Sequence, residues 1–186
     1  MNRITLVTGG ARSGKSTFAE QLLKEEERVL YIATAIAFDE EMKERIKKHQ
    51  KSRPRCWDTF EGYKNLKEVI EQKAKAYNFV LLDCVTLWIS NLLFDFFSFE
   101  EWERFDEGEF DKAEKIICQE VQAVIDMLKT TNTNIVFVTN ELGFSLTPEN
   151  KMGRVFRDIQ GRINQLIAKN ADDVFLLVCG QPLKIK

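Results

Sequence analysis

The sequence lacks the features that mark several large classes of protein. Only three of its 186 residues are proline, and only one is histidine. Its 27 lysine and arginine residues are balanced by 29 aspartate and glutamate residues, for a formal net charge of −2, so we expect no nucleic-acid partner. No apolar run approaches the length of a membrane span, and the first residues do not have the layout of a signal peptide. These absences predict a cytoplasmic protein without a membrane span.

The cysteines are few and form neither a metal-binding nor a disulfide pattern. They are Cys56, Cys84, Cys118 and Cys179, and no two are spaced as C-x-x-C. Three of them lie in or beside apolar segments. This pattern predicts buried thiols in a reducing compartment, and neither a disulfide framework nor a zinc site.

Short apolar segments alternate with amphipathic ones along the chain. The expected strands, rich in β-branched or aromatic residues, cover residues 4–8, 29–33, 79–83, 135–139 and 174–179. The expected helices cover residues 15–26, 40–49, 63–76, 110–129 and 155–169. Strands that alternate with helices indicate an α/β fold with a parallel sheet and right-handed crossovers.

Two segments in the middle of the chain are rich in aromatic residues. Residues 92–99 contain a cluster of apolar side chains: Leu92, Leu93, Phe94, Phe96, Phe97 and Phe99. We expect this cluster in the core or at a subunit interface, because one small domain does not easily bury so much aromatic surface. Residues 100–111 are acidic and contain Trp102, Phe105 and Phe110. We expect this second segment to be a surface excursion at the end of a helix.

The segment G-G-A-R-S-G-K-S directly follows the first expected strand. It matches the phosphate-binding P-loop, G-x-x-x-x-G-K-[ST], and it has the preceding strand and following helix that a chance match lacks. Its glycines allow a tight turn that directs backbone N–H groups at phosphate oxygens, and the helix N-terminus adds positive potential. We expect Lys15 to reach the β- and γ-phosphates and Ser16 to hold Mg²⁺. The expected phosphate-binding residues are Gly9, Gly10, Ala11, Arg12, Ser13, Gly14, Lys15 and Ser16.

A carboxylate ends the third expected strand, F-V-L-L-D, at Asp83. In P-loop enzymes an acidic residue at such a place lies beside the phosphates and helps to hold Mg²⁺. A helix N-cap has the same appearance in a sequence, but the P-loop upstream favours the metal role. The combined pattern predicts one P-loop NTPase-like domain over residues 1–186, with three layers and a mainly parallel sheet.

His49 follows Met42 and Ile46 at helical spacing, so all three are expected on one helix face. It lies among the basic residues Lys47, Lys48, Lys51, Arg53 and Arg55. Taken alone, these residues favour a histidine at a helix C-terminus, where its positive charge is stabilised. The alternative is a nucleophile whose neighbouring cations neutralise a bound polyphosphate, with Arg53 making forked contacts to phosphate oxygens.

Two further candidates are a carboxylate before an expected helix and a polar loop after an expected strand. Glu61 is either an acceptor for a guanine base or ribose, or a surface carboxylate. Residues 140–148 follow an expected strand, and loops at the carboxyl ends of parallel strands build the sites of α/β proteins. The helix after this loop carries Arg154, Arg157, Asp158 and Arg162. Their spacing does not decide whether they face solvent or an anionic partner.

Together these segments closely resemble one family, the bifunctional adenosylcobinamide kinase and adenosylcobinamide-phosphate guanylyltransferase of cobalamin biosynthesis. The matching pieces are L-V-T-G-G-A-R-S-G-K-S (6–16), Y-I-A-T-A (31–35), H-x-x-x-R-P (49–54), W-x-T-x-E (57–61), L-L-D-C-V-T (81–86), V-T-N-E-L-G (138–143), P-E-N (148–150), F-R-D-I-x-G-R-x-N-Q (156–165) and the terminal K-I-K. The H-x-x-x-R-P and F-R-D-I-x-G-R-x-N-Q pieces are far more specific than the P-loop, and the resemblance runs from residue 4 to the C-terminus. In the loop where the family commonly reads N-E-V-G-x-G, Ser145 replaces the second glycine.

The resemblance implies two activities in one homotrimeric enzyme. One is phosphorylation of adenosylcobinamide with ATP or GTP, and the other is transfer of GMP from GTP to adenosylcobinamide phosphate. It implies that His49 attacks the α-phosphate of GTP and carries GMP as a phosphoramidate, with Lys15 as the second catalytic residue. Nucleotide contacts outside the P-loop are then expected from Thr34, Lys51, Ser52, Arg53, Glu61 and Asp83.

Two other functions are compatible with the P-loop. One is a small-molecule kinase in which His49 is structural, and the other is a GTP-binding switch without a small-molecule substrate. The sequence has no N-K-x-D motif, by which regulatory GTPases recognise guanine. Only the enzyme with two activities predicts a covalent GMP adduct.

Overall fold

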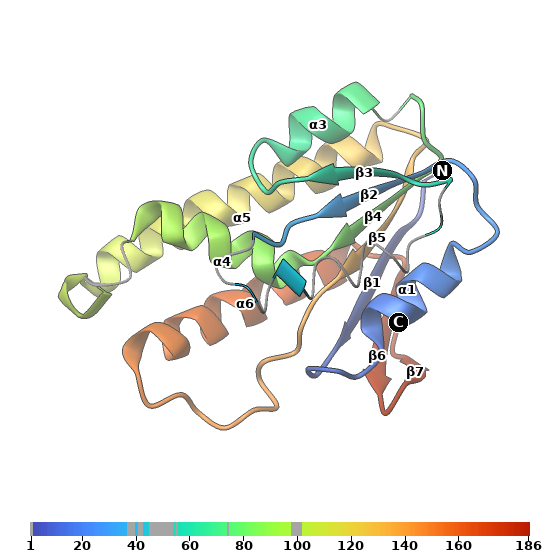
Figure 1. The fold of residues 1–186 in the computed structure, drawn as a ribbon. Coiled ribbons are helices and arrows are strands. Elements are labelled where there is room, and N and C mark those ends of the chain that lie inside the picture. Colours follow the sequence, from blue (N-terminus) through green and yellow to red (C-terminus); the bar gives the residue numbers. More distant parts are fainter. Residues whose placement is uncertain are drawn as a thin grey trace.

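The described residues form one seven-stranded sheet with the strand order β3-β2-β4-β5-β1-β6-β7. The computed structural model describes residues 2–36, 40, 43–44, 54, 56–73, 75–97 and 102–186. Strands β1 to β6 pair in parallel, and β7 pairs antiparallel with β6 (Figure 1). The strands are β1 (Ile4–Gly9), β2 (Val29–Ala33), β3 (Asp58–Glu61), β4 (Phe79–Asp83), β5 (Asn134–Val138), β6 (Asp173–Val178) and β7 (Gln181–Lys184).

Helices cover both faces of the sheet and form the two outer layers (Figure 1). They are α1 (Lys15–Leu22), α3 (Leu66–Lys73), α4 (Val85–Phe96), the short 3-10 helix η1 (Trp102–Arg104), α5 (Glu107–Lys129) and α6 (Lys151–Asn170). Helix α1 packs on one face, and α3, α4, α5 and α6 pack on the other. The expected α/β fold with a mainly parallel sheet is confirmed.

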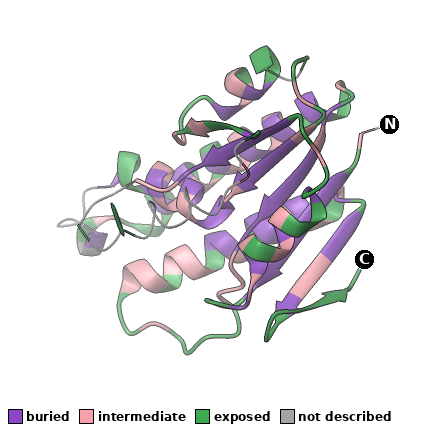
Figure 2. Cartoon of the chain, turned by 45° about the vertical axis from the view of Figure 1, so that its right-hand side comes forward, coloured by how far each residue is buried: buried purple, intermediate pink, exposed green. Residues whose placement is uncertain are grey.

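Alternate residues of each central strand pack in two separate hydrophobic cores, one on each face of the sheet. In β1, Leu6 belongs to the larger core beneath α3 to α6, whereas Val7 belongs to the smaller core beneath α1. The same alternation separates Ile32 from Tyr31 in β2. Strands buried on both faces read as continuous apolar runs, and Figure 2 shows the central strands as buried and β7 as exposed.

The sequence analysis missed β3 and β7, which lie at the two edges of the sheet. All four residues of β7 are exposed, and β3 has no fully buried residue. An edge strand contacts solvent along one side, so it needs no apolar run and tolerates a proline such as Pro182. The physical environment of these strands therefore removed the signal by which strands are found.

Helix α4 was also missed, because it has no clear polar face. Six of its twelve residues are buried, including Trp88 and Ile89, and a helix buried over most of its surface shows no amphipathic period. The apolar cluster expected over residues 92–99 is divided by this helix. Leu93 and Phe97 are in the core, whereas Phe94 and Phe96 are 38% and 42% exposed; Phe99 lies outside the described residues.

The expectation of a surface excursion over residues 100–111 was wrong for its aromatic side chains. Trp102 and Phe110 are each 4% exposed. Their rings pack against Phe97, with centroid separations of 5.2 Å and 4.9 Å, and Phe105 lies 4.6 Å from Phe97. A capping box at Asp106 and Glu109 then starts α5 at Glu107 rather than at Phe110. Acidic residues in this stretch serve as helix caps around a buried aromatic cluster.

The cysteines differ from one another in burial. Cys84 is buried and Cys118 is partly buried, as expected, but Cys56 and Cys179 are exposed. Cys179 lies just beyond the end of β6, in the turn to β7, with a φ of 51°. The prediction of buried thiols is therefore wrong for these two residues.

Among the described residues, no helix combines the length and the apolar character needed to cross a bilayer.

Asp173 joins the first residues of the chain to the last strand. It is 4% exposed, and it forms ion pairs with Arg3, which precedes β1, and with Lys184 in β7. The hydrogen bond from Arg3, followed by that from Lys184, lowers the pKa of Asp173 to about 2, against the opposing effect of burial.

We expect Asp173→Asn to lower the free energy of unfolding by about 1–2 kcal/mol at pH 7. The folded-state pKa lies below the ordinary value of 3.8, so this stabilisation is present above pH 4 and is lost as the pH falls toward 2. Urea unfolding at pH 7 and pH 3 measures both effects. The control is Glu71→Gln, which removes an exposed ion pair with Lys67 and should change stability by less than about 0.5 kcal/mol. Equal changes in the free energy of unfolding for the two variants would contradict a stabilising role of the Asp173 ion pairs.

Candidate nucleotide-binding site

The P-loop connects the carboxyl end of β1 to the first turn of α1. Gly9 ends the strand with a φ of 153°, and Gly14 caps the helix with a φ of 94°. Arg12 lies between them with a φ of 57°. The Phe18 N–H donates to the Gly14 carbonyl at 2.9 Å, which closes the first helical turn. The loop therefore has the strand–turn–helix geometry that brings backbone N–H groups together at a helix N-terminus.

Two of the P-loop glycines are required by close neighbours from β6 and the turn after it. A Cβ atom on Gly9 would lie 2.5 Å from the Leu177 carbonyl oxygen. One on Gly14 would lie 3.2 Å from the Cα atom of Gly180. In contrast, a Cβ atom on Gly10 would meet nothing within 4 Å. The end of β6 thus supports the P-loop from the side, while Gly10 faces open space.

Lys15 lies across the loop that precedes it. Its side chain is 8% exposed, and its Nζ donates a hydrogen bond to the Gly10 carbonyl oxygen at 2.6 Å. Ser13 is buried, Ser16 is half-buried, and Ala11 and Arg12 are exposed. A lysine at this position of a P-loop is the residue that reaches the β- and γ-phosphates of a bound nucleotide.

Three predicted residues outside the P-loop lie at the same edge of the sheet. Ala33, the last residue of β2, is in register with Glu61 at the end of β3 and with Asp83 at the end of β4. Thr34, which follows β2, is fully buried; its hydroxyl donates to the Cys84 carbonyl at 2.7 Å and accepts from the Cys84 N–H at 2.9 Å. Glu61 is exposed and Asp83 is half-buried.

The strand order sets the distances between residues at the carboxyl ends of the parallel strands. Only β5 lies between β4 and β1, so Asp83 and the P-loop are about two strand spacings, or 10 Å, apart. Glu61 is four strand spacings from β1, or about 19 Å.

Burial, and then the charge of Asp83, raise the pKa of the Cys84 thiol to about 12, whereas the charge of Lys15 lowers it. Both charged groups therefore act on one buried thiol, which stays protonated and unreactive.

The oxygen donors near the P-loop suit magnesium. Ser16 offers a hydroxyl and Asp83 a carboxylate, and both are half-buried. Among the described residues, no three histidine, cysteine or acidic side chains gather as a metal site. Mg²⁺ is typically held by one or two carboxylates together with substrate phosphates, and Ser16 and Asp83 are the residues that could hold it here.

The sequence analysis missed Tyr31, which holds the Asp83 side chain. Tyr31 is 1% exposed in the middle of β2, and its hydroxyl donates to Asp83 Oδ2 at 2.7 Å. A tyrosine in an otherwise aliphatic buried strand is a weak signal for such a contact, since a buried hydroxyl needs a partner.

Six residues named in the sequence analysis lie outside the described residues: Met42, Ile46, His49, Lys51, Ser52 and Arg53.

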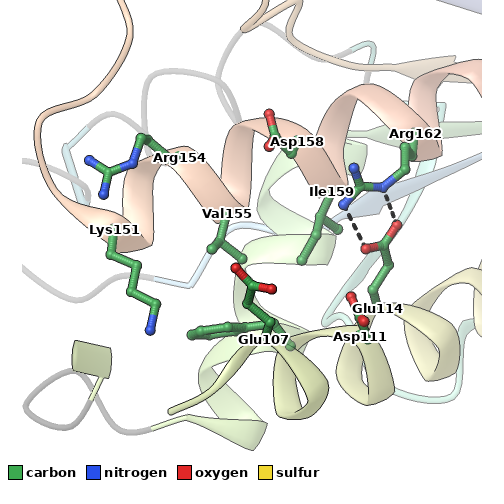
Figure 3. A pocket seen from close by; sticks show the side chains of 10 residues that line it. Glu107, Asp111, Glu114, Lys151, Arg154, Val155, Asp158, Ile159 and Arg162 are labelled. Atoms are coloured by element: carbon green, nitrogen blue, oxygen red, sulfur yellow. Dashed lines mark hydrogen bonds and ion pairs between the residues drawn. The ribbon is translucent and has the colours of Figure 1, made fainter. Parts of the chain in front are cut away.

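The arginines of α6 contact neighbouring parts of the same chain. Arg162 forms a two-pronged ion pair with Glu114 of α5 (Figure 3). Arg154 donates to the Pro148 carbonyl at 3.2 Å, and Arg157 donates to the Thr147 hydroxyl at 3.2 Å. Between α5 and α6 lies a pocket of about 390 Å³ with charged walls around Phe110, Val155 and Ile159. The arginines therefore brace the loop before α6 and join this helix to α5.

Comparison with known proteins identifies the family. The sequence profile described as "Cobinamide kinase / cobinamide phosphate guanyltransferase" matches residues 5–185. The chain belongs to this family. It is 43% identical to the bifunctional adenosylcobalamin biosynthesis protein CobU of Escherichia coli (strain K12), over 97% of this chain and 98% of the relative.

Two further relatives give the same result. The bifunctional adenosylcobalamin biosynthesis protein CobU of Salmonella typhimurium is 42% identical, over 97% of this chain and 98% of the relative. The bifunctional adenosylcobalamin biosynthesis protein CobP of Pseudomonas aeruginosa is 36% identical, over 97% of this chain and 96% of the relative. The family resemblance inferred from the motifs is confirmed, and it extends over nearly the whole chain.

The contrast between Gly9 and Gly10 gives a direct test of the P-loop geometry. We expect Gly9→Ala to lower the free energy of unfolding by about 2 kcal/mol or more, because it combines an unfavourable φ with a steric clash. Gly10→Ala adds the same methyl group in open space and should change stability by less than about 0.5 kcal/mol. Urea unfolding of the two variants measures the difference. If both lose the same stability, the contact between the P-loop and β6 is not as described.

Proposed function

We propose that this chain is a bifunctional enzyme of cobalamin biosynthesis. It phosphorylates the aminopropanol hydroxyl of adenosylcobinamide with ATP or GTP. It then transfers GMP from GTP to adenosylcobinamide phosphate, giving adenosylcobinamide-GDP and pyrophosphate. The observation that carries this proposal is the family match over residues 5–185, together with full-length relatives named as bifunctional proteins of adenosylcobalamin biosynthesis.

The P-loop supplies the phosphate site in this proposal. Residues Gly9 to Ser16 bind the nucleotide phosphates through backbone N–H groups, and Lys15 neutralises charge that develops during transfer. Phosphoryl transfer requires mainly positioning and charge stabilisation, which fits a loop held between β1, β6 and α1. Ser16 and Asp83 would hold Mg²⁺, which neutralises phosphate charge when bound.

His49 is the nucleophile for the second activity. A neutral imidazole nitrogen attacks the α-phosphorus of GTP, the bond to the bridging oxygen of the β-phosphate breaks, and pyrophosphate leaves. A phosphate oxygen of adenosylcobinamide phosphate then attacks the same phosphorus, and the bond to the imidazole breaks. A covalent intermediate of this kind divides one difficult transfer into two displacements.

The remaining predicted residues complete the nucleotide site. Lys51, Ser52 and Arg53 follow His49 and contact phosphate oxygens, with Arg53 suited to forked contacts. Thr34, Glu61 and Asp83 contact the nucleotide from the ends of β2, β3 and β4. We further propose that residues 1–186 act as one catalytic domain in the cytoplasm.

We expect His49→Asn to abolish labelling by α-labelled GTP and to spare much of the kinase step, because phosphorylation of the hydroxyl needs no imidazole. The adduct on the wild-type protein should be labile to acid and stable to base, and labelling should fall as the imidazole becomes protonated at acidic pH. Mass spectrometry with GTP and Mg²⁺ detects the added GMP.

Lys15→Ala is the complementary variant. It should reduce kinase turnover by roughly 10²- to 10³-fold with an unchanged circular dichroism spectrum.

Uptake of GMP by His49→Asn would contradict the proposed nucleophile. A wild-type protein that phosphorylates cobinamide but never labels would be a kinase alone.

We propose a homotrimer in which the exposed end of α4 contributes to the subunit interface. Phe94 and Phe96 are large apolar side chains left exposed next to the aromatic cluster. Light scattering at micromolar concentration should give three times the chain mass of 21.6 kDa. Phe96→Ser should weaken assembly, whereas Ile116→Ser, at an exposed position of α5, should not. A wild-type particle of single-chain mass rules out this assembly.

A further inference from the structure

Four polar side chains are buried together beside the carboxyl end of β5. Thr139 and Gln160 are fully buried, and Thr86 and Asn164 are each 7% exposed. Polar groups removed from water are costly unless they are hydrogen bonded. Their positions are far apart in the sequence, since Thr86 is in α4, Thr139 follows β5, and Gln160 and Asn164 are in α6.

The hydrogen bonds among these side chains close a ring that includes the backbone N–H and C=O of one residue, Asn140. The Thr139 hydroxyl donates to Asn164 Oδ1 at 2.8 Å, and Asn164 Nδ2 donates to the Asn140 carbonyl at 3.0 Å. The Asn140 N–H donates to the Thr86 hydroxyl at 2.8 Å, and the two threonine hydroxyls are 3.5 Å apart. Both backbone groups of Asn140 are therefore held by side chains.

These contacts replace strand pairing at the place where it ends. The last pair between β4 and β5 joins Asp83 and Val138, so Asn140 has no partner from β4. On its other side, β5 continues along β1, because the Thr139 N–H donates to Val7 O at 3.0 Å and the Glu141 N–H donates to Gly9 O at 2.9 Å. Thr86 and Asn164 thus keep this extension in line with β1.

The extension ends on the first peptide of the P-loop. A peptide unit is planar and normally trans, so a hydrogen bond that fixes the Gly9 carbonyl also fixes the direction of the Gly10 N–H group. The register of Gly9 with Leu177 places that N–H group on the side of β6. A side chain of α6 is in this way connected, through one loop residue, to the peptide from which the P-loop starts.

We propose that Asn164 is a positioning residue for the P-loop. It holds the carbonyl of the Asn140–Glu141 peptide, which keeps the Glu141 N–H on the Gly9 carbonyl and so fixes the position from which the nucleotide-binding P-loop starts. This inference rests on the proposed function for its consequence in binding, but the hydrogen-bonded connection is a property of the free protein.

Gln160 provides a matched control for Asn164. Its Nε2 donates to Thr139 Oγ1 at 2.8 Å and to Asn164 Oδ1 at 2.9 Å, both of which are side-chain atoms. It is more deeply buried than Asn164, so a general loss of packing or polar pairing should harm Gln160→Leu at least as much as Asn164→Leu. Only a positioning role predicts that the two variants differ at Glu141 and in nucleotide affinity.

The experiment combines amide hydrogen exchange with GTP titration of the full chain. In Asn164→Leu, exchange at the Glu141 amide should become about tenfold faster or more, and the Kd for GTP should rise about tenfold. Gln160→Leu should leave both within about threefold of wild type. Asn164→Ser, whose side chain is too short to reach the Asn140 carbonyl, gives the same result and serves if the leucine variant does not fold.

Two outcomes separate this inference from the proposed function. Unchanged exchange at Glu141 in a folded Asn164 variant, or equal effects of the Asn164 and Gln160 variants, overturns the positioning role. If the wild-type protein binds neither GTP nor ATP, the proposed function fails, and the exchange result alone then decides whether Asn164 holds the loop.

Discussion

The hydrogen-bonded position of β1 between β5 and β6 is the constraint on which the rest of the structure depends. Its register with β5 continues past the end of the strand, through the bond from the Glu141 N–H to Gly9. On the other side, its register with β6 brings Leu177 opposite Gly9, and the Gly180 N–H then donates to Ser13 at 3.0 Å. The P-loop is therefore held from both sides by backbone, and glycine is required where these neighbours come closest.

This constraint explains why buried polar residues gather at one end of an otherwise apolar sheet. After β2, the Thr34 carbonyl accepts a hydrogen bond from Asn91 Nδ2 at 2.8 Å. After β5, the Thr139 hydroxyl donates a hydrogen bond to Asn164 Oδ1. Parallel strands that stop without a partner leave backbone groups unpaired, and buried backbone groups require partners. Side chains supply these partners, so the loops at the site have defined positions.

The sequence predicted the buried parts of this fold well and its edges poorly. The strands that contain Val7, Tyr31 and Leu81 are continuous apolar runs because both faces are covered, and such runs are recognisable without a structure. The edge strands β3 and β7 lack a continuous apolar run, and helix α4 lacks the polar face by which an amphipathic helix is recognised. Trp102 was misplaced because acidic neighbours that cap α5 resemble an exposed loop.

The site was predictable to the extent that its chemistry is local in sequence. The P-loop is one continuous segment, and Asp83 ends a recognisable strand, so both could be placed from spacing and residue type. Tyr31 and Asn164 act on partners 52 and 24 positions away, and neither belongs to a pattern that names its partner. Such contacts are set by strand order, which periodicity does not specify.

Strand order also gives physical room for the proposed pair of reactions. Asp83 is about two strand spacings from β1, close enough to serve phosphates bound at the P-loop, whereas Glu61 on β3 is about four spacings away. A nucleotide whose phosphates lie at the P-loop would have to extend along this edge for its base or ribose to approach Glu61. His49 falls in the connection between β2 and β3, the two strands at the Glu61 end. Under the proposed function, this order of strands separates phosphate binding at β1 from base or ribose recognition at β3, and the proposed nucleophile lies in the segment that joins β2 to β3.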